Sequence, residues 1–290
     1  MTAWPSIECQ RGCEQHATRP VVVNLGGPTG YADLPAVPRR LATQFEIMVW
    51  DQDVFAYGGE ALTMSESPSD RYCPARLDPV SDGIQKHGVW EPAETIAALD
   101  ILTSDIPGWL VDVGAHVGWF SVLAEQCGRS IYAAEADPAN RAVLRGNIQI
   151  ARQAIVAGRI DVLGDWPPLP GIVALAKINV EGAEPEAVGW LWPRIVEGKV
   201  AALIVEMSPV FHGRYVDMAL RIVRAGYDAY AFPGKVVGRA LEPFCDEPGQ
   251  LRAGLRSVGG NEERLVSHVK SIKQENWIFL REDLFRDGGR

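Results

Sequence analysis

Residues 109–119 read WLVDVGAHVGW, and this short stretch predicts the fold. The apolar, β-prone run at 109–113 has the composition of a buried strand, whereas residues 117–127 have helical spacing and are followed by a glycine. Between these segments, Gly114 and Gly118 lie four residues apart and permit a turn too tight for ordinary side chains. A strand, a glycine turn and a helix N-terminus together form a place to hold a ligand.

Composition limits the class of protein. The chain has 290 residues, enough for one large or two small domains, and 47% of them are apolar and 22% charged, as in ordinary globular proteins. Its net charge of −9 argues against general affinity for nucleic acid or anionic membranes. No apolar run is long enough to span a bilayer, the N-terminus lacks the apolar stretch of a signal peptide, and the five cysteines are scattered. We therefore expect a cytoplasmic protein with reduced thiols.

The N-terminal sequence CQRGCEQH spaces Cys9, Cys13 and His16 as C-x3-C-x2-H. This spacing is close to the C-x3-C-x2-C run that holds an iron–sulfur cluster in radical SAM enzymes, and Cys and His are also zinc ligands. The competing interpretation is a fraying terminus with incidental thiols. We favour the second interpretation and expect no metal site.

The domain organisation follows from changes in pattern along the chain. Residues 1–20 are expected to form a flexible leader, and residues 21–90 an N-terminal extension. This extension holds two strand-like runs, VVVNL and FEIMVW, and a polar, proline-rich linker or lid loop at 63–83. Residues 91–290 are expected to form the main domain. We expect the extension to cover the sheet edge or to cap a substrate pocket, and to support a homodimer.

From residue 91 onward, helix-like and strand-like segments alternate. Helices are predicted at 91–102, 117–127, 138–151, 184–196, 215–225 and 262–272, and strands at 109–113, 130–135, 159–163, 174–180, 200–207, 227–232 and 276–281. Such alternation predicts an α/β fold with a mostly parallel sheet and helices on both faces. One connection, residues 164–173, is short and proline-rich, so we expect an extended loop there.

An acid at the end of the second strand of this domain points to a nucleoside cofactor. Glu135 follows Gly114 by 21 residues, and an acid about 20 residues beyond a glycine turn accepts the ribose hydroxyls in nucleotide-binding α/β folds. The turn reads D-x-G-A-x-x-G and differs from the G-x-G-x-x-G of dinucleotide sites. Asp112 would repel a pyrophosphate but suits the ammonium group of a methionine moiety, which favours S-adenosylmethionine (SAM).

Four segments, DVGAHVGWFS, AAEADPANRAVLRGNI, KINVEGAEPEAV and ALIVEMSP, occur in this order. Together they resemble the FkbM-type SAM-dependent methyltransferases over about two-thirds of the chain, and KINVEGAE is the most specific part of the likeness. The resemblance implies a Rossmann-like class I methyltransferase fold with a seven-stranded sheet. It also implies methyl transfer, typically to the hydroxyl of a sugar or natural product.

The resemblance further implies a set of cofactor contacts. Asp112, Gly114 and Gly118 would hold the methionine end, and Glu135 would hold the ribose. Asp165 would contact the adenine amino group, with Ala136 and Asp137 beside the adenine. The full set of positions is Asp112, Gly114, Ala115, His116, Gly118, Glu135, Ala136, Asp137 and Asp165.

The acceptor end departs from the family. The family reads K-I-D where this chain has Asn179, and an amide can hydrogen-bond but cannot act as a base. Glu181, which would share a side of a regular strand with Asn179, is the first candidate for the general base, and His212 is the second. We expect a small-molecule or glycan acceptor. Methylation of nitrogen or of a macromolecule, and a catalytically weak SAM-binding or regulatory protein, are the alternatives.

Overall fold

The computed structural model describes residues 20–25, 45–50, 78–148, 153–157, 169, 171–209, 214–232 and 255–285. The described helices are α2 (Pro79–His87), α3 (Pro92–Leu102), α4 (Trp119–Gln126), α5 (Pro138–Asn147), α6 (Glu184–Val196), α7 (Arg214–Arg224), α8 (Glu262–Ser271) and α9 (Glu282–Phe285). The described strands are β1 (Pro20–Leu25), β2 (Phe45–Trp50), β3 (Trp109–Val113), β4 (Ile131–Glu135), β5 (Gln153–Ala157), β6 (Val173–Ile178), β7 (Val200–Met207), β8 (Tyr227–Ala231), β9 (Arg256–Ser257) and β10 (Glu275–Arg281).

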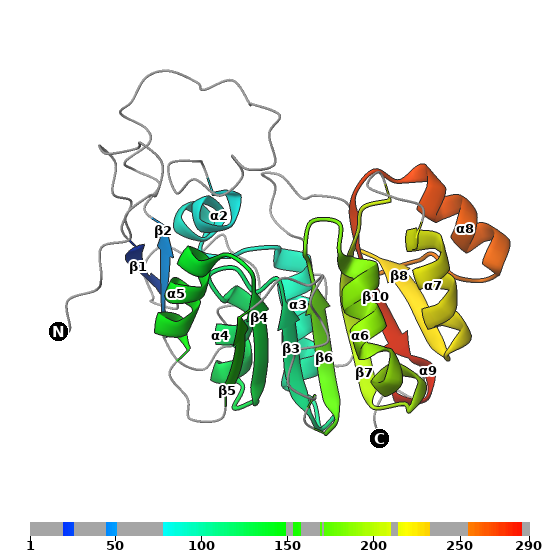
Figure 1. Cartoon of the computed structure of the whole chain (residues 1–290), viewed down its shortest axis with the longest axis horizontal. Coiled ribbons are helices and arrows are strands. Elements are labelled where there is room, and N and C mark those ends of the chain that lie inside the picture. The colour runs from blue at the N-terminus through cyan, green and yellow to red at the C-terminus, as the bar shows by residue number, and fades with distance from the viewer. Residues whose placement is uncertain are drawn as a thin grey trace, which may run out of the picture.

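The main sheet has the order β5-β4-β3-β6-β7-β10-β8-β9 (Figure 1). Strands β5, β4, β3, β6 and β7 are parallel, whereas β10 runs antiparallel to both β7 and β8. The predicted Rossmann-like, mostly parallel sheet is therefore confirmed, with the two-residue β9 as an additional edge strand. The chain leaves β3 toward β4 and β5 and returns on the other side at β6, so the strand order reverses there. In open α/β sheets, ligands bind at the carboxyl ends of the strands beside such a reversal.

Helices cover both faces of this sheet, as the alternation predicted. One face packs against α3, α4 and α5, through side chains such as Leu99, Leu123 and Leu144. The opposite face packs against α6, α7 and α8. Strand residues alternate between the two layers: Leu110 belongs to the first core, and Val111 to the second. Within the described ranges, no helix combines the length and apolar character needed to cross a membrane.

The sequence interpretation was wrong between α5 and β6. The helix predicted for 138–151 ends at Asn147, because Ile148 has extended backbone dihedrals. The next strand is β5, at 153–157, which pairs in parallel with β4. The strand predicted at 159–163 lies outside the described residues. Among the described residues, β6 is the next strand after β5, and residues 158–172 lie between the two.

The structure also replaces part of the predicted linker at 63–83 with a helix. Asp78 caps α2, since its carboxylate accepts hydrogen bonds from the backbone N–H groups of Val80 and Ser81. Pro79 occupies the first turn, and Gly88 ends the helix with φ +69°. An N-cap acid followed by proline, with a glycine after the helix, is a recognised helix signal that a reading based on polarity missed.

The two N-terminal strands were predicted correctly and form a separate antiparallel pair, with Val22 opposite Met48. Strand β2 packs on the outer helices, where Ile47 and Val49 are fully buried. Figure 1 shows the pair beside α5, outside the main sheet. Asn147 fixes this position, because its side chain accepts a hydrogen bond from the Met48 N–H (2.7 Å) and donates to the Met48 carbonyl (2.8 Å) and to the Val117 carbonyl (2.7 Å).

Candidate functional site

The glycine turn after β3 is tight because β6 ends directly against it. Gly114 has φ +82°, and a Cβ atom there would lie 1.7 Å from the carbonyl oxygen of Asn179. Gly118 has φ +94° and caps α4, and a Cβ atom there would lie 2.6 Å from the Leu144 side chain. Internal packing thus requires both glycines. A bulky substitution at Gly114 would therefore destabilise the fold, whether or not the turn binds a ligand.

Glu135 joins the end of β4 to this turn. Its Oε2 accepts a hydrogen bond from the backbone N–H of His116 at 2.7 Å, and its Oε1 accepts one from the N–H of Asp137 at 2.7 Å. The residue is only 9% exposed, and burial raises the pKa of its carboxyl. Each carboxylate oxygen keeps a further lone pair, so the group can still accept hydrogen bonds from a ligand.

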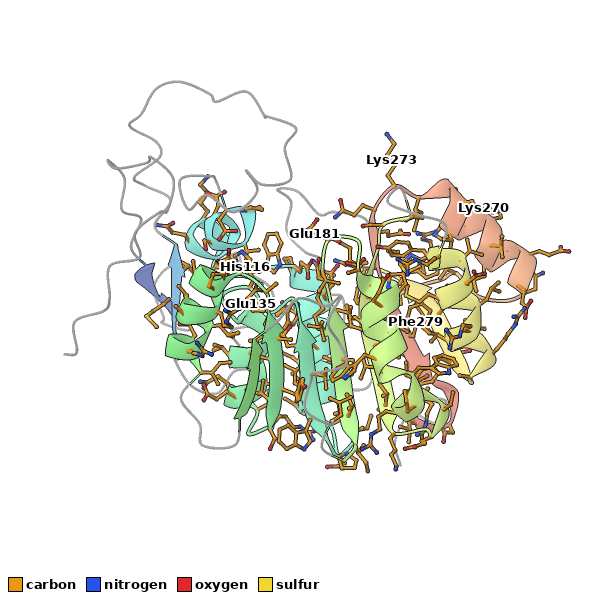
Figure 2. The ribbon with its side chains drawn as sticks, in the orientation of Figure 1. His116, Glu135, Glu181, Lys270, Lys273 and Phe279 are labelled. Carbon is orange, nitrogen blue, oxygen red and sulfur yellow. The ribbon has the colours of Figure 1, made fainter. Side chains whose placement is uncertain are left out.

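His116 sits in the same turn with φ +54°. Figure 2 shows His116, Glu135 and Glu181 along one edge of the sheet. The His116 Nε2 atom lies 3.3 Å from the carboxylate of Asp78, at the start of α2. Its Nδ1 atom is buried and makes no hydrogen bond with any described residue. The N-terminal extension therefore contacts the glycine turn through this imidazole.

The other predicted cofactor residues have varied surroundings. Asp112 is 2% exposed, and its carboxylate accepts a hydrogen bond from the Ser121 hydroxyl at 2.6 Å. Burial raises the pKa of Asp112 to about 6, and its contact with a methionine moiety stays a prediction. Ala115 is buried and its N–H donates to the Ala134 carbonyl, whereas Ala136 is exposed.

Asp137 has a structural task at the start of α5. One of its carboxylate oxygens accepts hydrogen bonds from the N–H groups of Ala139 and Asn140, so it caps the helix. Asp165 and His212 lie outside the described residues. The structure therefore brings together the glycine turn, Glu135 and Asp137, and leaves the adenine contact at Asp165 and the role of His212 as predictions.

The turn after β6 differs from the geometry assumed in the sequence analysis. The strand ends at Ile178, so Asn179 and Glu181 do not share a regular strand side. Glu181 is exposed, with φ +53°. Glu184 supports the turn, because its buried carboxylate accepts hydrogen bonds from the N–H groups of Val180 and Gly182 and from the hydroxyl of Tyr215.

A row of polar side chains that the sequence analysis did not assemble crosses the sheet near this edge. Asp112 is in register with Lys177, and Glu206 with Asn276. Residues in register point to the same face, and each of these four lies two residues along its strand from an apolar residue of the core beneath α3 and α4. With Glu135 on β4, five neighbouring strands each contribute one polar residue to this face.

Lys177 lies at the centre of the row. Its Nζ is 3.1 Å from Glu91 Oε2 and 5.3 Å from the ring centre of Phe120. Asn276 Nδ2 donates to Glu91 Oε1 at 2.9 Å and to Glu94 Oε1 at 2.8 Å. Burial alone would lower the pKa of Lys177, but the neighbouring carboxylates raise it overall. Burial and the adjacent Glu91 raise the pKa of Glu94 to about 7.

Within the row, the carboxyl of Glu206 is affected by the charges of Glu181 and Glu184 at the β6 turn. It is 6% exposed, and its carboxylate accepts a hydrogen bond from Gln274 at 2.6 Å and a longer one from Ser208 at 3.4 Å. Burial, aided by the charges of Glu181 and Glu184, raises its pKa to about 7. The sequence signal for this residue was an acid at the end of an otherwise apolar strand, VAALIVEM.

Comparison with known proteins yields distant structural likeness. No protein-family model matches the chain, and no curated protein does. The chain is similar to a TehB-like SAM-dependent methyltransferase from Corynebacterium glutamicum, with 13% identity, a TM-score of 0.39, and coverage of 69% of this chain and 93% of that chain. It is similar to magnesium protoporphyrin IX methyltransferase from Synechocystis, solved with bound SAM, with 13% identity, a TM-score of 0.40, and coverage of 71% and 85%.

A SAM-dependent methyltransferase from Mesorhizobium loti gives 16% identity, a TM-score of 0.37, and coverage of 66% of this chain and 99% of that chain. At these identities and TM-scores, the likeness carries no inference about cofactor, substrate or site.

Proposed function

We propose that this protein is a SAM-dependent methyltransferase that methylates a hydroxyl group of a small molecule or glycan. The observation that carries the proposal is the position of Glu135: a buried carboxylate at the end of β4, beside the glycine turn of β3, next to the reversal of strand order. In α/β folds this is the place of the acid that binds a ribose diol. The resemblance of four ordered segments to the FkbM-type methyltransferases supports the same cofactor.

The residues present fit the cofactor. Glu135 retains free lone pairs toward the edge, and His116 Nδ1 is a buried polar atom without a hydrogen-bond partner among the described residues. Helix α4 begins after Gly118 without a side-chain cap, and a helix N-terminus favours a polar or negatively charged ligand group. When bound there, SAM would supply the electrophilic methyl group, and the protein would hold and orient it.

The same turn argues against a dinucleotide. In a G-x-G-x-x-G turn starting at Gly114, the second and third glycines would fall at positions 116 and 119, which carry His116 and Trp119 here. The second glycine of that motif lets the backbone approach a pyrophosphate, and the third lets the helix pack closely on the strand. A histidine in a left-handed conformation and a buried tryptophan therefore remove both features.

The acceptor is expected over the ends of β6 and β7. There the protein must take a proton from the hydroxyl as the new carbon–oxygen bond forms. Glu181 remains the first candidate for this base, since it is exposed at the edge, and Asn179 would orient the acceptor by hydrogen bonding. Glu206 is a further candidate, because a carboxyl with a pKa of about 7 is a stronger base than an ordinary glutamate. His212 remains a proposal from the sequence.

Calorimetric titration with SAM, S-adenosylhomocysteine and NAD tests the cofactor. We expect the first two to bind and NAD not to bind, and binding of NAD alone would overturn the proposal. Incubation of the protein and a small-molecule extract with methyl-labelled SAM then tests the reaction. A labelled methyl ether supports hydroxyl methylation, a labelled amine moves the acceptor to nitrogen, and SAM binding without any labelled product points to a regulatory SAM-binding protein.

A further inference from the structure

The contact between Asp78 and His116 defines the hydrogen-bonding character of the imidazole. Asp78 accepts hydrogen bonds from the N–H groups of Val80 and Ser81, one at each of its two carboxylate oxygens. An ionised carboxylate only accepts hydrogen bonds, so the His116 Nε2 atom, 3.3 Å away, must carry the proton of that contact. In a neutral imidazole the other ring nitrogen, Nδ1, then presents a lone pair.

This lone pair needs a donor. Nδ1 is buried and makes no hydrogen bond with any described residue, and a buried acceptor without a partner is costly. The backbone N–H of the same histidine donates to Glu135 Oε2 at 2.7 Å, so the ring belongs to the residue that directly touches the proposed ribose acceptor. A ribose has two adjacent hydroxyl donors. One of them can donate to the carboxylate of Glu135, which leaves the other available for Nδ1.

We propose that the ribose diol is shared: one hydroxyl donates to Glu135 and the other donates to His116 Nδ1, with Asp78 of the N-terminal extension as the positioning residue that sets the imidazole tautomer. This inference rests on the proposed SAM site and makes the extension part of it. Tight binding would therefore require both ribose hydroxyls, each hydrogen-bonded to a different side chain.

A binding cycle tests the pairing without any knowledge of the acceptor. The affinities of S-adenosylhomocysteine and of its 2′-deoxy and 3′-deoxy analogues are measured by calorimetry for the wild-type protein and for His116→Gly. Glycine tolerates the left-handed backbone and keeps the N–H that donates to Glu135, but it removes the imidazole and leaves no acceptor in its place. His268→Ala, on α8, is the control for the loss of a histidine away from the turn.

In the wild-type protein, we expect loss of either hydroxyl to weaken binding by about fivefold or more, the value of one hydrogen bond. In His116→Gly, removal of one of the two hydroxyls should no longer weaken binding, while removal of the other keeps its full effect. If removal of either hydroxyl weakens binding in His116→Gly as much as in the wild type, Nδ1 does not bind a hydroxyl and the inference is wrong. If the wild-type protein binds neither SAM nor S-adenosylhomocysteine, the proposed function itself fails, and this inference fails with it.

Asp78 is tested in the same cycle. Asp78→Ser keeps a helix cap but is too short to reach the imidazole, whereas Asp78→Asn keeps both the cap and an acceptor oxygen. We expect Asp78→Ser to remove the contribution of the same hydroxyl as His116→Gly, and Asp78→Asn to restore it. An equal loss for all three ligands in Asp78→Ser would show a merely structural role and would overturn the assignment of Asp78.

Discussion

The raised pKa of Glu206 predicts a specific dependence of stability on pH. A tenfold change in proton affinity corresponds to about 1.4 kcal/mol of free energy. A pKa raised from 4.5 to about 7 on folding therefore changes the unfolding free energy by roughly 3 kcal/mol between low and high pH. The folded chain binds this proton more tightly than the unfolded chain. The contribution is therefore fully present below pH 4.5 and is lost as the pH rises through about 7.

Replacement of this carboxyl by an amide isolates the effect. Glu206→Gln resembles the protonated acid and can still accept the hydrogen bond from Gln274. We expect the difference in unfolding free energy between Glu206→Gln and the wild type to rise in favour of Glu206→Gln by roughly 2 to 3 kcal/mol as the pH is raised from 5 to 8. Other buried acids, such as Glu94, titrate in both proteins, so their contributions to the unfolding free energy cancel in this difference.

Urea unfolding followed by circular dichroism at several pH values measures the effect. Ser208→Ala, which removes the 3.4 Å hydrogen bond but keeps the carboxyl, is the matched control and should retain the wild-type dependence on pH. A difference between Glu206→Gln and the wild type that stays constant from pH 5 to pH 8 would refute the reasoning.

Three further predictions concern the extension, the turn and the cofactor. Asn147→Ala should lower the unfolding free energy by roughly 2 to 4 kcal/mol, since it removes one buried and two partly buried hydrogen bonds to backbone groups, and urea unfolding measures this. Gly114→Ala should cost about 3 kcal/mol or more, because its Cβ meets a carbonyl at 1.7 Å. Gly128→Ala, with φ +70° and nothing within 4 Å, should cost about 1 kcal/mol, and equal losses would contradict the steric argument. Glu135→Ala should weaken SAM binding at least about 100-fold in calorimetry, and unchanged affinity in the folded variant would remove the proposed site.

Much of the fold could be predicted from local sequence. The helix at 184–196 and the strand at 200–207 were predicted at their observed limits, because their apolar spacing is regular and they are bounded by turn residues. The alternation of such segments was enough to predict a mostly parallel sheet. Local pattern failed at 148–157, where Ile148 and the residues after it fit either a helix end or an edge strand.

Some residues of the candidate site could likewise be found from the sequence, and others could not. Gly114 and Glu135 could be found from the sequence, because a glycine turn and an acid at a strand end belong to one continuous strand–turn–helix–strand unit. Their proximity follows from that unit alone, and the hydrogen bond between Glu135 and the turn agrees with it. The position of Glu181 could not be predicted, because the end of β6 depends on where the strand meets the glycine turn.

The contacts between segments far apart in the chain could not be predicted from local sequence. Lys177 meets Glu91, Glu206 lies beside Asn276, and His116 meets Asp78, although no local pattern links the members of these pairs. Sheet register and helix packing bring them together. Local sequence was enough to predict most helices and strands of the main sheet and to propose where a nucleoside is held, because those properties depend on neighbours along the chain. The polar row and the link to the extension depend on neighbours in space.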